Sequence, residues 1–269
     1  MTPLAAAWQN TRAMDPWLIG VPIGIAAGLA GVTAYGAVNS RAQLFGHTIW
    51  HAEKPKKLAL TFDDGPNPAI TPNLLKLLEK HDAKATFFLV GKYVREAPSL
   101  AKEIVERGHA VGNHTETHPN LFFCGPEETR NELLRCSEAI GNATWEEPRW
   151  FRPPFGYRSP WLASIALHYR MRTVMWTLIP GDWRVKPREW LIERMKPIAA
   201  HAQGSSGTGK GTNRRAQGDV LCLHDGDYAR PNADRNRTLE ALEYWMPRWR
   251  DLGLEFATIG QSLGKAVEG

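Results

Sequence analysis

Short apolar runs alternate with amphipathic stretches along most of the chain after residue 55. Apolar runs of about four to eight residues are typical of buried strands, whereas leucines that recur every three to four residues are typical of helices with one buried face. The predicted strands are Leu58–Phe62, Ala85–Val90, His109–Asn113, Met171–Leu178 and Val220–His224. The predicted helices are Thr71–Lys80, Ala97–Arg107, Glu127–Ile140 and Thr238–Arg250. This alternation predicts an α/β protein built from βα units around a parallel sheet or barrel.

The amino-terminal region has a different pattern. Residues 17–38 carry no charge and consist mainly of Ile, Leu, Val, Ala and Gly. About twenty such residues are needed to span a bilayer, and Trp17 and Tyr35 stand near the ends as interfacial aromatic residues do. We therefore predict a transmembrane anchor at 17–38, between a short tail (1–16) and a juxtamembrane linker (39–55). A cleaved signal peptide is the alternative interpretation.

Basic residues on both sides of this segment bear on its orientation. Arg12 precedes the segment, and the basic residues that follow it are Arg41, Lys54, Lys56 and Lys57. A positive-inside count by itself would leave the large domain in the cytoplasm. The chemistry described below favours an extracytoplasmic domain, and we favour that orientation.

Length and composition are consistent with one folded core. The 269 residues, with 43% hydrophobic content, predict one folded domain from residue 56 onward that includes a flexible, low-complexity loop at 204–218. The net charge of +5 comes from scattered Lys and Arg residues, which argues against a nucleic-acid partner. The segment Gly204–Lys210 approaches a phosphate loop, but Gly211 replaces the required Ser or Thr and no strand precedes it, so we exclude nucleotide binding.

The cysteines indicate no metal cluster of their own. The chain has three cysteines and no CxxC pair, so neither a thiolate zinc site nor a disulfide framework is indicated. Cys222 lies within an apolar predicted strand, and we interpret it as a small buried hydrophobic residue.

Polar pairs stand at the ends of two predicted strands. Asp63 and Asp64 end the first strand, and two adjacent carboxylates need a counter-charge, most simply a metal ion. His114 and His118 follow the strand His109–Asn113, and a spacing of four lets both imidazoles face one side of a helical turn and share a metal. Two histidines and a carboxylate with an open position form the ligand set of a hydrolytic metal site.

Three further segments carry candidate chemistry. Arg152–Tyr157 contains two prolines and a glycine, so it forms a stiff loop that can present a guanidinium and a backbone N–H at fixed positions. Asp182 and Trp183 follow the strand Met171–Leu178. His224 ends the last strand, where an imidazole can donate or accept a proton near neutral pH.

These segments together resemble a known family. The sequences TFDDGPNP, KATFFLVG, GHAVGNHTETH, RPPFGY, GDW and LCLHDG occur in this order and are similar to the five motifs of the polysaccharide deacetylase family, the NodB homology domain or carbohydrate esterase family 4. The resemblance extends over about residues 56–264 and implies that this range is the catalytic domain. It implies a distorted, incomplete (β/α) barrel, preceded here by the predicted transmembrane helix, with the site at the carboxyl ends of the strands.

The resemblance also implies the central roles. Asp63 corresponds to the catalytic base and His224 to the catalytic acid. A divalent metal, usually Zn²⁺ with Co²⁺, Ni²⁺ or Mn²⁺ as alternatives, would be held by Asp64, His114 and His118.

Supporting roles follow from the same motifs. Arg152 corresponds to the residue that positions the base, and Asp182 to an acid that orients either this arginine or the catalytic acid. The backbone N–H of Phe155 corresponds to an oxyanion donor. Trp183 and Leu223 correspond to the walls of the pocket for the acetyl methyl group.

One position departs from the family pattern, because Ile179 stands where another Asp is common. This departure affects the surroundings of the site but removes none of the groups named above. We predict a metal-dependent hydrolase that removes N-acetyl groups from GlcNAc-type sugars of peptidoglycan, a chitin-like glycan or another extracellular polysaccharide. The alternatives are a deacylase of a lipid-linked amino sugar, an O-deacetylase of a polysaccharide, and a non-catalytic carbohydrate-binding protein.

Overall fold

The computed structural model describes residues 16–204 and 217–264, with side chains from residue 27 onward. Its centre is an eight-stranded sheet whose paired strands are parallel. The strands lie in the order β1-β6-β5-β4-β3-β2-β7, and β8 pairs with the start of β2. Their bounds are β1 Thr48–Ile49, β2 Lys57–Gly65, β3 Thr86–Leu89, β4 Ala110–Asn113, β5 Trp150–Phe151, β6 Arg172–Val174, β7 Asp219–His224 and β8 Glu255–Ala257.

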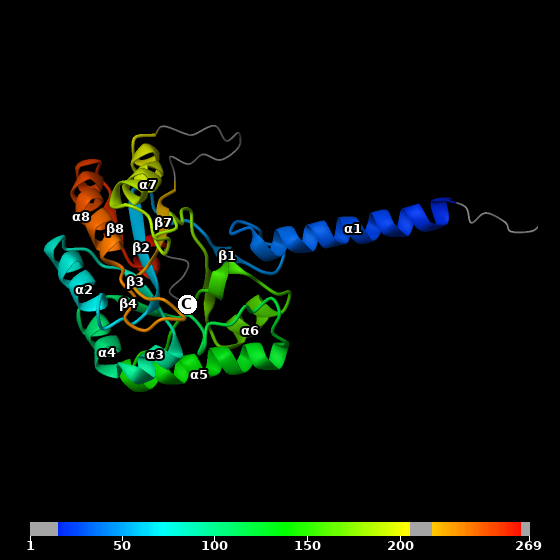
Figure 1. Ribbon diagram of the computed structural model, residues 1–269, viewed down its shortest axis with the longest axis horizontal. Helices are drawn as coiled ribbons and strands as arrows, with labels where there is room; N and C mark the ends of the chain where they lie inside the picture. The colour runs from blue at the N-terminus through cyan, green and yellow to red at the C-terminus, as the bar shows by residue number, and fades with distance from the viewer. Residues whose placement is uncertain (1–15, 205–216, 265–269) are drawn as a thin grey trace, which may run out of the picture.

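Helices surround the sheet on its outer side (Figure 1). In this view α2, α4 and α8 lie along one side of the strands, and α3 and α5 lie along the lower edge. The bounds are α1 Pro16–Val38, α2 Thr71–Lys80, α3 Gly91–Glu96, α4 Pro98–Glu106, α5 Pro126–Thr144, α6 Leu162–His168, α7 Arg188–Ala202, α8 Asn236–Asp251 and α9 Ile259–Ser262. A short 3₁₀ turn, Pro154–Gly156, follows β5.

The sheet curves into a barrel that is closed only loosely. Its two outermost strands are β1 and β7. Near this gap the chain forms isolated bridges, an antiparallel one between Ala52 and Gly218 and a parallel one between Leu178 and Leu221. The α/β architecture with its parallel sheet agrees with the predicted incomplete barrel. Strand β1 lies within the segment predicted as a linker (39–55), so that segment contributes to the sheet.

Alternation along β2 separates the core from the site. Leu58, Leu60 and Phe62 are fully buried and pack with the helices in the largest core cluster. Thr61 and Asp63 occupy the alternate positions and face the inside of the barrel, because successive side chains of a strand point to opposite faces. The helix layer therefore supplies the apolar packing that holds β2 in place, while the other face carries polar groups.

Most predicted elements are confirmed. The helix Thr71–Lys80 has the predicted bounds, and its apolar face is the buried one. The predicted strand Met171–Leu178 is too long, because β6 ends at Val174 and the chain then crosses toward β7, where the Thr177 N–H donates to Val220 O (2.9 Å). Helices α3, α6 and α7 were not predicted from the periodicity.

Helix α1 extends away from the barrel (Figure 1) and includes the predicted anchor at 17–38. Across the described parts of the chain, no helix combines the length and the apolar character needed to cross a membrane. The structure therefore gives no support to the predicted transmembrane anchor. Side chains of 17–26, the tail up to residue 15 and loop residues 205–216 lie outside the described residues.

Candidate active site

The carboxyl ends of four neighbouring strands bring the predicted site residues together. Asp63 of β2 lies opposite His224 of β7 in the parallel ladder. On the other side of β2, β3 pairs with β4, so that Leu89 lies opposite Asn113 and His114 follows directly. Because these registers are fixed by the sheet, the two carboxylates, the histidines after β4 and the histidine that ends β7 are held at one edge.

Asp64, His114 and His118 form a group that can hold a metal ion. The Nε2 atoms of His114 and His118 lie 3.4 and 3.2 Å from Oδ1 of Asp64. This oxygen is buried, and no described residue donates a hydrogen bond to it. Two atoms that each lie about 2.0–2.2 Å from a tetrahedral zinc ion are roughly 3.3–3.5 Å apart. The observed separations therefore fit ligands of one shared ion.

The histidines are also oriented as metal binding requires. Nδ1 of His114 lies 2.7 Å from the carbonyl oxygen of Arg152, which can only accept, so Nδ1 carries a proton and Nε2 is the nitrogen turned toward Asp64. Burial lowers the pKa of His118, which favours its neutral form. A lone-pair nitrogen and a carboxylate oxygen at this distance repel each other unless a proton or a metal cation lies between them. The donor set therefore fits a divalent metal.

The loop after β4 differs from the expected helical turn. Thr115 and His118 have left-handed backbones, with φ of 69° and 63°, so the spacing of four does not place both histidines on a helix face. Instead, Asn113 Oδ1 accepts from the Thr115 N–H (2.8 Å), and Thr115 Oγ1 accepts from the His118 N–H (3.0 Å). These two hydrogen bonds bend the loop so that both imidazoles reach Asp64, which itself has φ of 70°.

Asp63 is fixed by a buried arginine. Arg152 is fully buried, and its NH1 donates to Asp63 Oδ1 (2.7 Å) and to Thr61 Oγ1 (2.7 Å). Its NH2 donates to the carbonyl oxygen of Met175 (3.0 Å). A guanidinium with several fixed acceptors has little freedom, so it holds the carboxylate of Asp63 in one orientation. The predicted pairing of Arg152 with Asp63 is present in the structure.

Asp182 lies against His224. Its Oδ1 accepts from His224 Nδ1 (2.8 Å), and its Oδ2 accepts from the His224 backbone N–H (2.8 Å) and from Thr238 Oγ1 (3.0 Å). Of the two arrangements predicted for Asp182, the structure has the one with His224. Burial by itself would lower the pKa of His224, but the nearby carboxylates, above all Asp182, outweigh it and raise this pKa to about 9.

A cleft of about 570 Å³ connects these groups. Asp63, the three candidate metal ligands and His224 lie along it, and Ile179 lines it where the family pattern has an acid. Aromatic side chains form much of the remaining wall. They are Phe155, Tyr157, Trp176, Trp183 and Tyr228. Rings of this kind suit the apolar faces of sugar rings.

The aromatic wall packs directly on the site histidines. The ring of Tyr228 stacks on His118 with centroids 4.4 Å apart, and Phe155 meets His118 edge-on at 4.7 Å. Trp183 meets His224 edge-on at 4.9 Å. Phe155 has φ of 57°, so the stiff loop presents it in a left-handed conformation. Tyr228 was missed in the sequence, although an aromatic residue four positions after a strand-end histidine was a usable signal.

The prediction for Leu223 is wrong. Leu223 is fully buried in the core cluster between strands and helices, on the face of β7 opposite to His224. Strand alternation instead places Cys222 on the face of His224, and its Sγ lies 3.3 Å from Asp63 Oδ2. Cys222 is buried as predicted, but its thiol lies beneath the site rather than in the apolar core.

Comparison with known proteins agrees with this geometry. A family model described as polysaccharide deacetylase matches residues 51–174. The chain is 32% identical to a peptidoglycan-N-acetylglucosamine deacetylase of Bacillus cereus, over 81% of the chain and 93% of the relative. It is 33% identical to a chitooligosaccharide deacetylase of Bradyrhizobium, over 77% and 90%. The crystal structure of a CE4 family pseudoenzyme from Bacillus anthracis is similar with a TM-score of 0.65 and 29% identity, over 80% of this chain and 68% of that one.

The chain therefore belongs to the polysaccharide deacetylase family. It is a hydrolase that acts on carbon–nitrogen bonds other than peptide bonds. The family is metal-dependent, and the group formed by Asp64, His114 and His118 can bind a metal.

Proposed function

We propose that this protein removes N-acetyl groups from GlcNAc residues of a polysaccharide, with Zn²⁺ as its metal. The observation that carries the proposal is the joint placement of two chemical units in one cleft. One unit is the ligand group Asp64, His114 and His118. The other is a carboxylate and an imidazole, Asp63 and His224, that lie opposite each other on neighbouring strands. Hydrolysis of an unactivated amide needs both electrophilic assistance and two proton transfers.

The residues divide the proton transfers between them. When bound, a divalent cation supplies Lewis-acid chemistry for amide hydrolysis. Asp63, held by Arg152, accepts the proton of the attacking water. His224 gives a proton to the nitrogen of the sugar as the carbon–nitrogen bond breaks, and acetate and the free amine leave. A pKa of about 9 keeps His224 protonated at neutral pH, which suits an acid.

The cleft supplies the remaining parts of the reaction. The backbone N–H of Phe155, at the stiff turn beside the ligands, is proposed to donate to the developing oxyanion. The exposed rings of Trp183, Tyr157 and Tyr228 are proposed to hold the sugar. The named activities of the relatives from Bacillus cereus and Bradyrhizobium favour peptidoglycan or chitin-like oligosaccharides as substrates. Such substrates would place the catalytic domain outside the cytoplasm, which protease protection in intact cells tests.

The experiment is acetate release by the full chain, freed of metal and then supplied with Zn²⁺. The substrates are chitooligosaccharides, peptidoglycan and acetylated xylan, and the Asp63→Asn variant serves as the blank. We expect zinc-dependent release from the N-acetyl glycans and none from the blank. Release from xylan alone would favour O-deacetylation. If none of these polysaccharides releases acetate although metal is bound, a lipid-linked amino sugar becomes the favoured substrate.

A non-catalytic role is the second candidate, because a pseudoenzyme is among the similar structures. The complete set of base, acid and ligands in this chain argues against it. Binding of chitooligosaccharides without turnover, unchanged between the wild type and Asp63→Asn, would support the non-catalytic role.

A further inference from the structure

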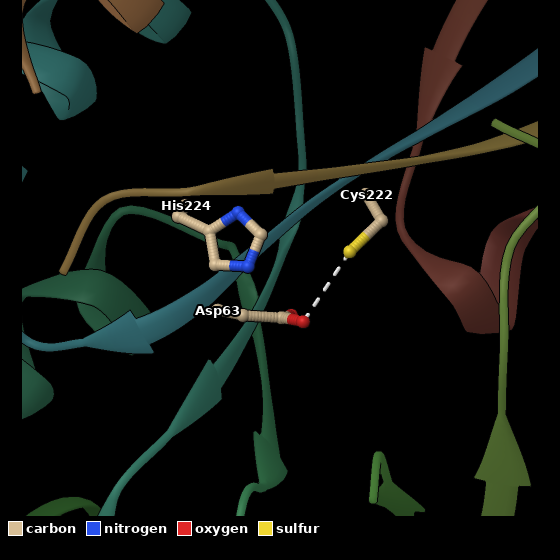
Figure 2. Close-up of side chains that lie close together, drawn as sticks. All are labelled: Asp63, Cys222 and His224. Carbon is tan, nitrogen blue, oxygen red and sulfur yellow. Dashed lines mark hydrogen bonds between the residues drawn. The ribbon is translucent and has the colours of Figure 1, made fainter. Parts of the chain in front are cut away.

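We propose a second cation site, formed by Asp63, Cys222 and His224, that takes a thiophilic divalent ion such as Zn²⁺ or Cd²⁺ and blocks the enzyme when filled. Figure 2 shows the three side chains converging from β2 and β7. None of them belongs to the group Asp64, His114 and His118. The blocking effect rests on the proposed function, whereas the binding itself does not.

The sheet brings the three side chains together. In the ladder between β2 and β7, Thr61 lies opposite Cys222 and Asp63 opposite His224. Residues 222 and 224 are two apart and therefore share a face of β7, and Asp63 lies on the corresponding face of β2. One ligand atom from each of Asp63, Cys222 and His224 lies within 4.8 Å of the others. The backbone ladder thus holds the cluster without any bound ion.

The ligand atoms of Cys222 and Asp63 have the separation of two ligands of one ion. The Cys222 thiol donates a hydrogen bond to Asp63 Oδ2 over 3.3 Å, and a bound cation would take the place of that proton. With a zinc–sulfur bond of about 2.3 Å and a zinc–oxygen bond of about 2.1 Å, this separation corresponds to an angle of roughly 100° at the metal. That angle is near the tetrahedral value, so these two side chains need little movement to bind.

His224 is oriented to complete the set. Its Nδ1 donates to Asp182 Oδ1 (2.8 Å), so Nε2 binds the ion after releasing the proton that it holds in the role of acid. Figure 2 shows the second ring nitrogen on the side of Asp63. A histidine ligand whose other nitrogen donates to a carboxylate is a common arrangement at zinc sites. One sulfur, one nitrogen and one oxygen select zinc or cadmium over magnesium or calcium.

The second site should be weaker than the first. The guanidinium of Arg152 lies 2.7 Å from Asp63 Oδ1 and repels a nearby cation. Among the described residues, no lysine or arginine forms an ion pair with Asp64, His114 or His118, and the Asp64 oxygen is open to a ligand bond. Metal added to the empty protein therefore fills Asp64, His114 and His118 first. Excess metal then occupies the base and the acid together, so turnover falls.

Cadmium tests the binding directly, because a cadmium–thiolate bond has a characteristic ultraviolet charge-transfer absorption. The metal-free full chain is titrated with Cd²⁺, beside the variants Cys222→Ser and Cys222→Ala. Cys136→Ser is the matched control, since Cys136 is equally buried and its Sγ faces the Leu89 carbonyl oxygen instead. We expect the absorption in the wild type and in Cys136→Ser, after a first equivalent that binds without it. We expect it to be absent from both Cys222 variants, which still bind the first equivalent.

Excess zinc tests whether filling the second site inhibits turnover. At a Zn²⁺ concentration ten times the dissociation constant of the second site, simple occupancy predicts roughly tenfold less acetate release than at one equivalent. In Cys222→Ala this ratio should be close to one, whatever the activity of the variant. Absorption that persists in both Cys222 variants, or that is missing from the wild type, overturns the site. Absorption with no turnover at any zinc level would keep the site and overturn the proposed function.

Discussion

The two halves of the site are built in different ways. The proton-transfer pair, Asp63 and His224, sits on regular strands and is placed by the ladder between β2 and β7. The ligand group lies at the last residues of β2, which include Asp64, and in the loop after β4, and Asp64 and His118 both have left-handed backbones. Left-handed residues other than glycine cost about 1–3 kcal/mol each when the surroundings must hold them there. The strand half is therefore positioned by the fold, whereas the loop half depends on local hydrogen bonds.

The largest expected effect comes from removing a ligand of the loop half. In His118→Ala we expect loss of stoichiometric metal and a fall in turnover of about 10⁴-fold, because the electrophilic assistance is worth several kcal/mol. Metal content after dialysis and acetate release are the measurements. A variant that retains one equivalent of metal would remove His118 from the ligand group.

Removing the base of the strand half should lower turnover without loss of metal. Asp63→Asn keeps the ligand group, so we expect metal content to stay at one equivalent while kcat falls about 10²–10⁴-fold, the usual contribution of a general base. Since Asn retains an oxygen that can accept from Arg152, the packing around the position should be preserved. Wild-type turnover in this variant would show that Asp63 is not the base.

A smaller effect is expected at Asp182. If His224 acts as the acid, activity falls as pH rises through its pKa, which is about 9 in the protein without metal. A cation at Asp64 offsets part of that carboxylate's charge, so the loss of activity at alkaline pH should be centred somewhat below pH 9. Asp182→Asn removes the charge that contributes most to the raised pKa of His224. We therefore expect activity to be lost at a lower alkaline pH, and kcat to fall about 10–100-fold. The measurement is the pH profile of kcat/KM. If activity is lost at the same alkaline pH in the variant, Asp182 does not set the pKa of the catalytic acid.

The sequence predicted the strand half of the site more fully than the loop half. Asp63 and His224 end apolar runs, and the order of strands follows from the βα alternation, so their convergence is a consequence of the fold. The sequence predicts that Asp182 orients either Arg152 or His224, because the order of residues does not tell which side chain a loop residue reaches.

Two errors have physical causes. A spacing of four was interpreted as a helical turn, but the loop at His114 and His118 is shaped by side-chain hydrogen bonds to Asn113 and Thr115 that no periodicity reveals. Leu223 was assigned to the pocket by its motif, although strand alternation puts its neighbour Cys222 on the face of His224. Alternation was the more reliable guide there, because it is set by backbone geometry.

The smallest effect should come from Asn113, and it tests whether the loop half really depends on local hydrogen bonds. The Asn113 side chain accepts from the Thr115 N–H and donates to the carbonyl oxygen of Leu133 (2.8 Å) and to Ser137 Oγ (2.9 Å). In Asn113→Ala the loop loses the bond that bends it toward Asp64. We expect metal affinity to fall about tenfold, as for other residues that orient ligands.

The control is Ser137→Ala, which removes one bond of Asn113 but leaves its contact with the loop. Metal affinity should be unchanged in this variant, even if the free energy of unfolding falls by about 1 kcal/mol. Competition with a chromophoric chelator gives the affinities, and denaturant unfolding of both metal-free variants gives the stabilities. If the two variants lost equal affinity, the effect would come from general loosening of the strand end. A loss confined to Asn113→Ala would show that a single amide sets the conformation of the ligand loop.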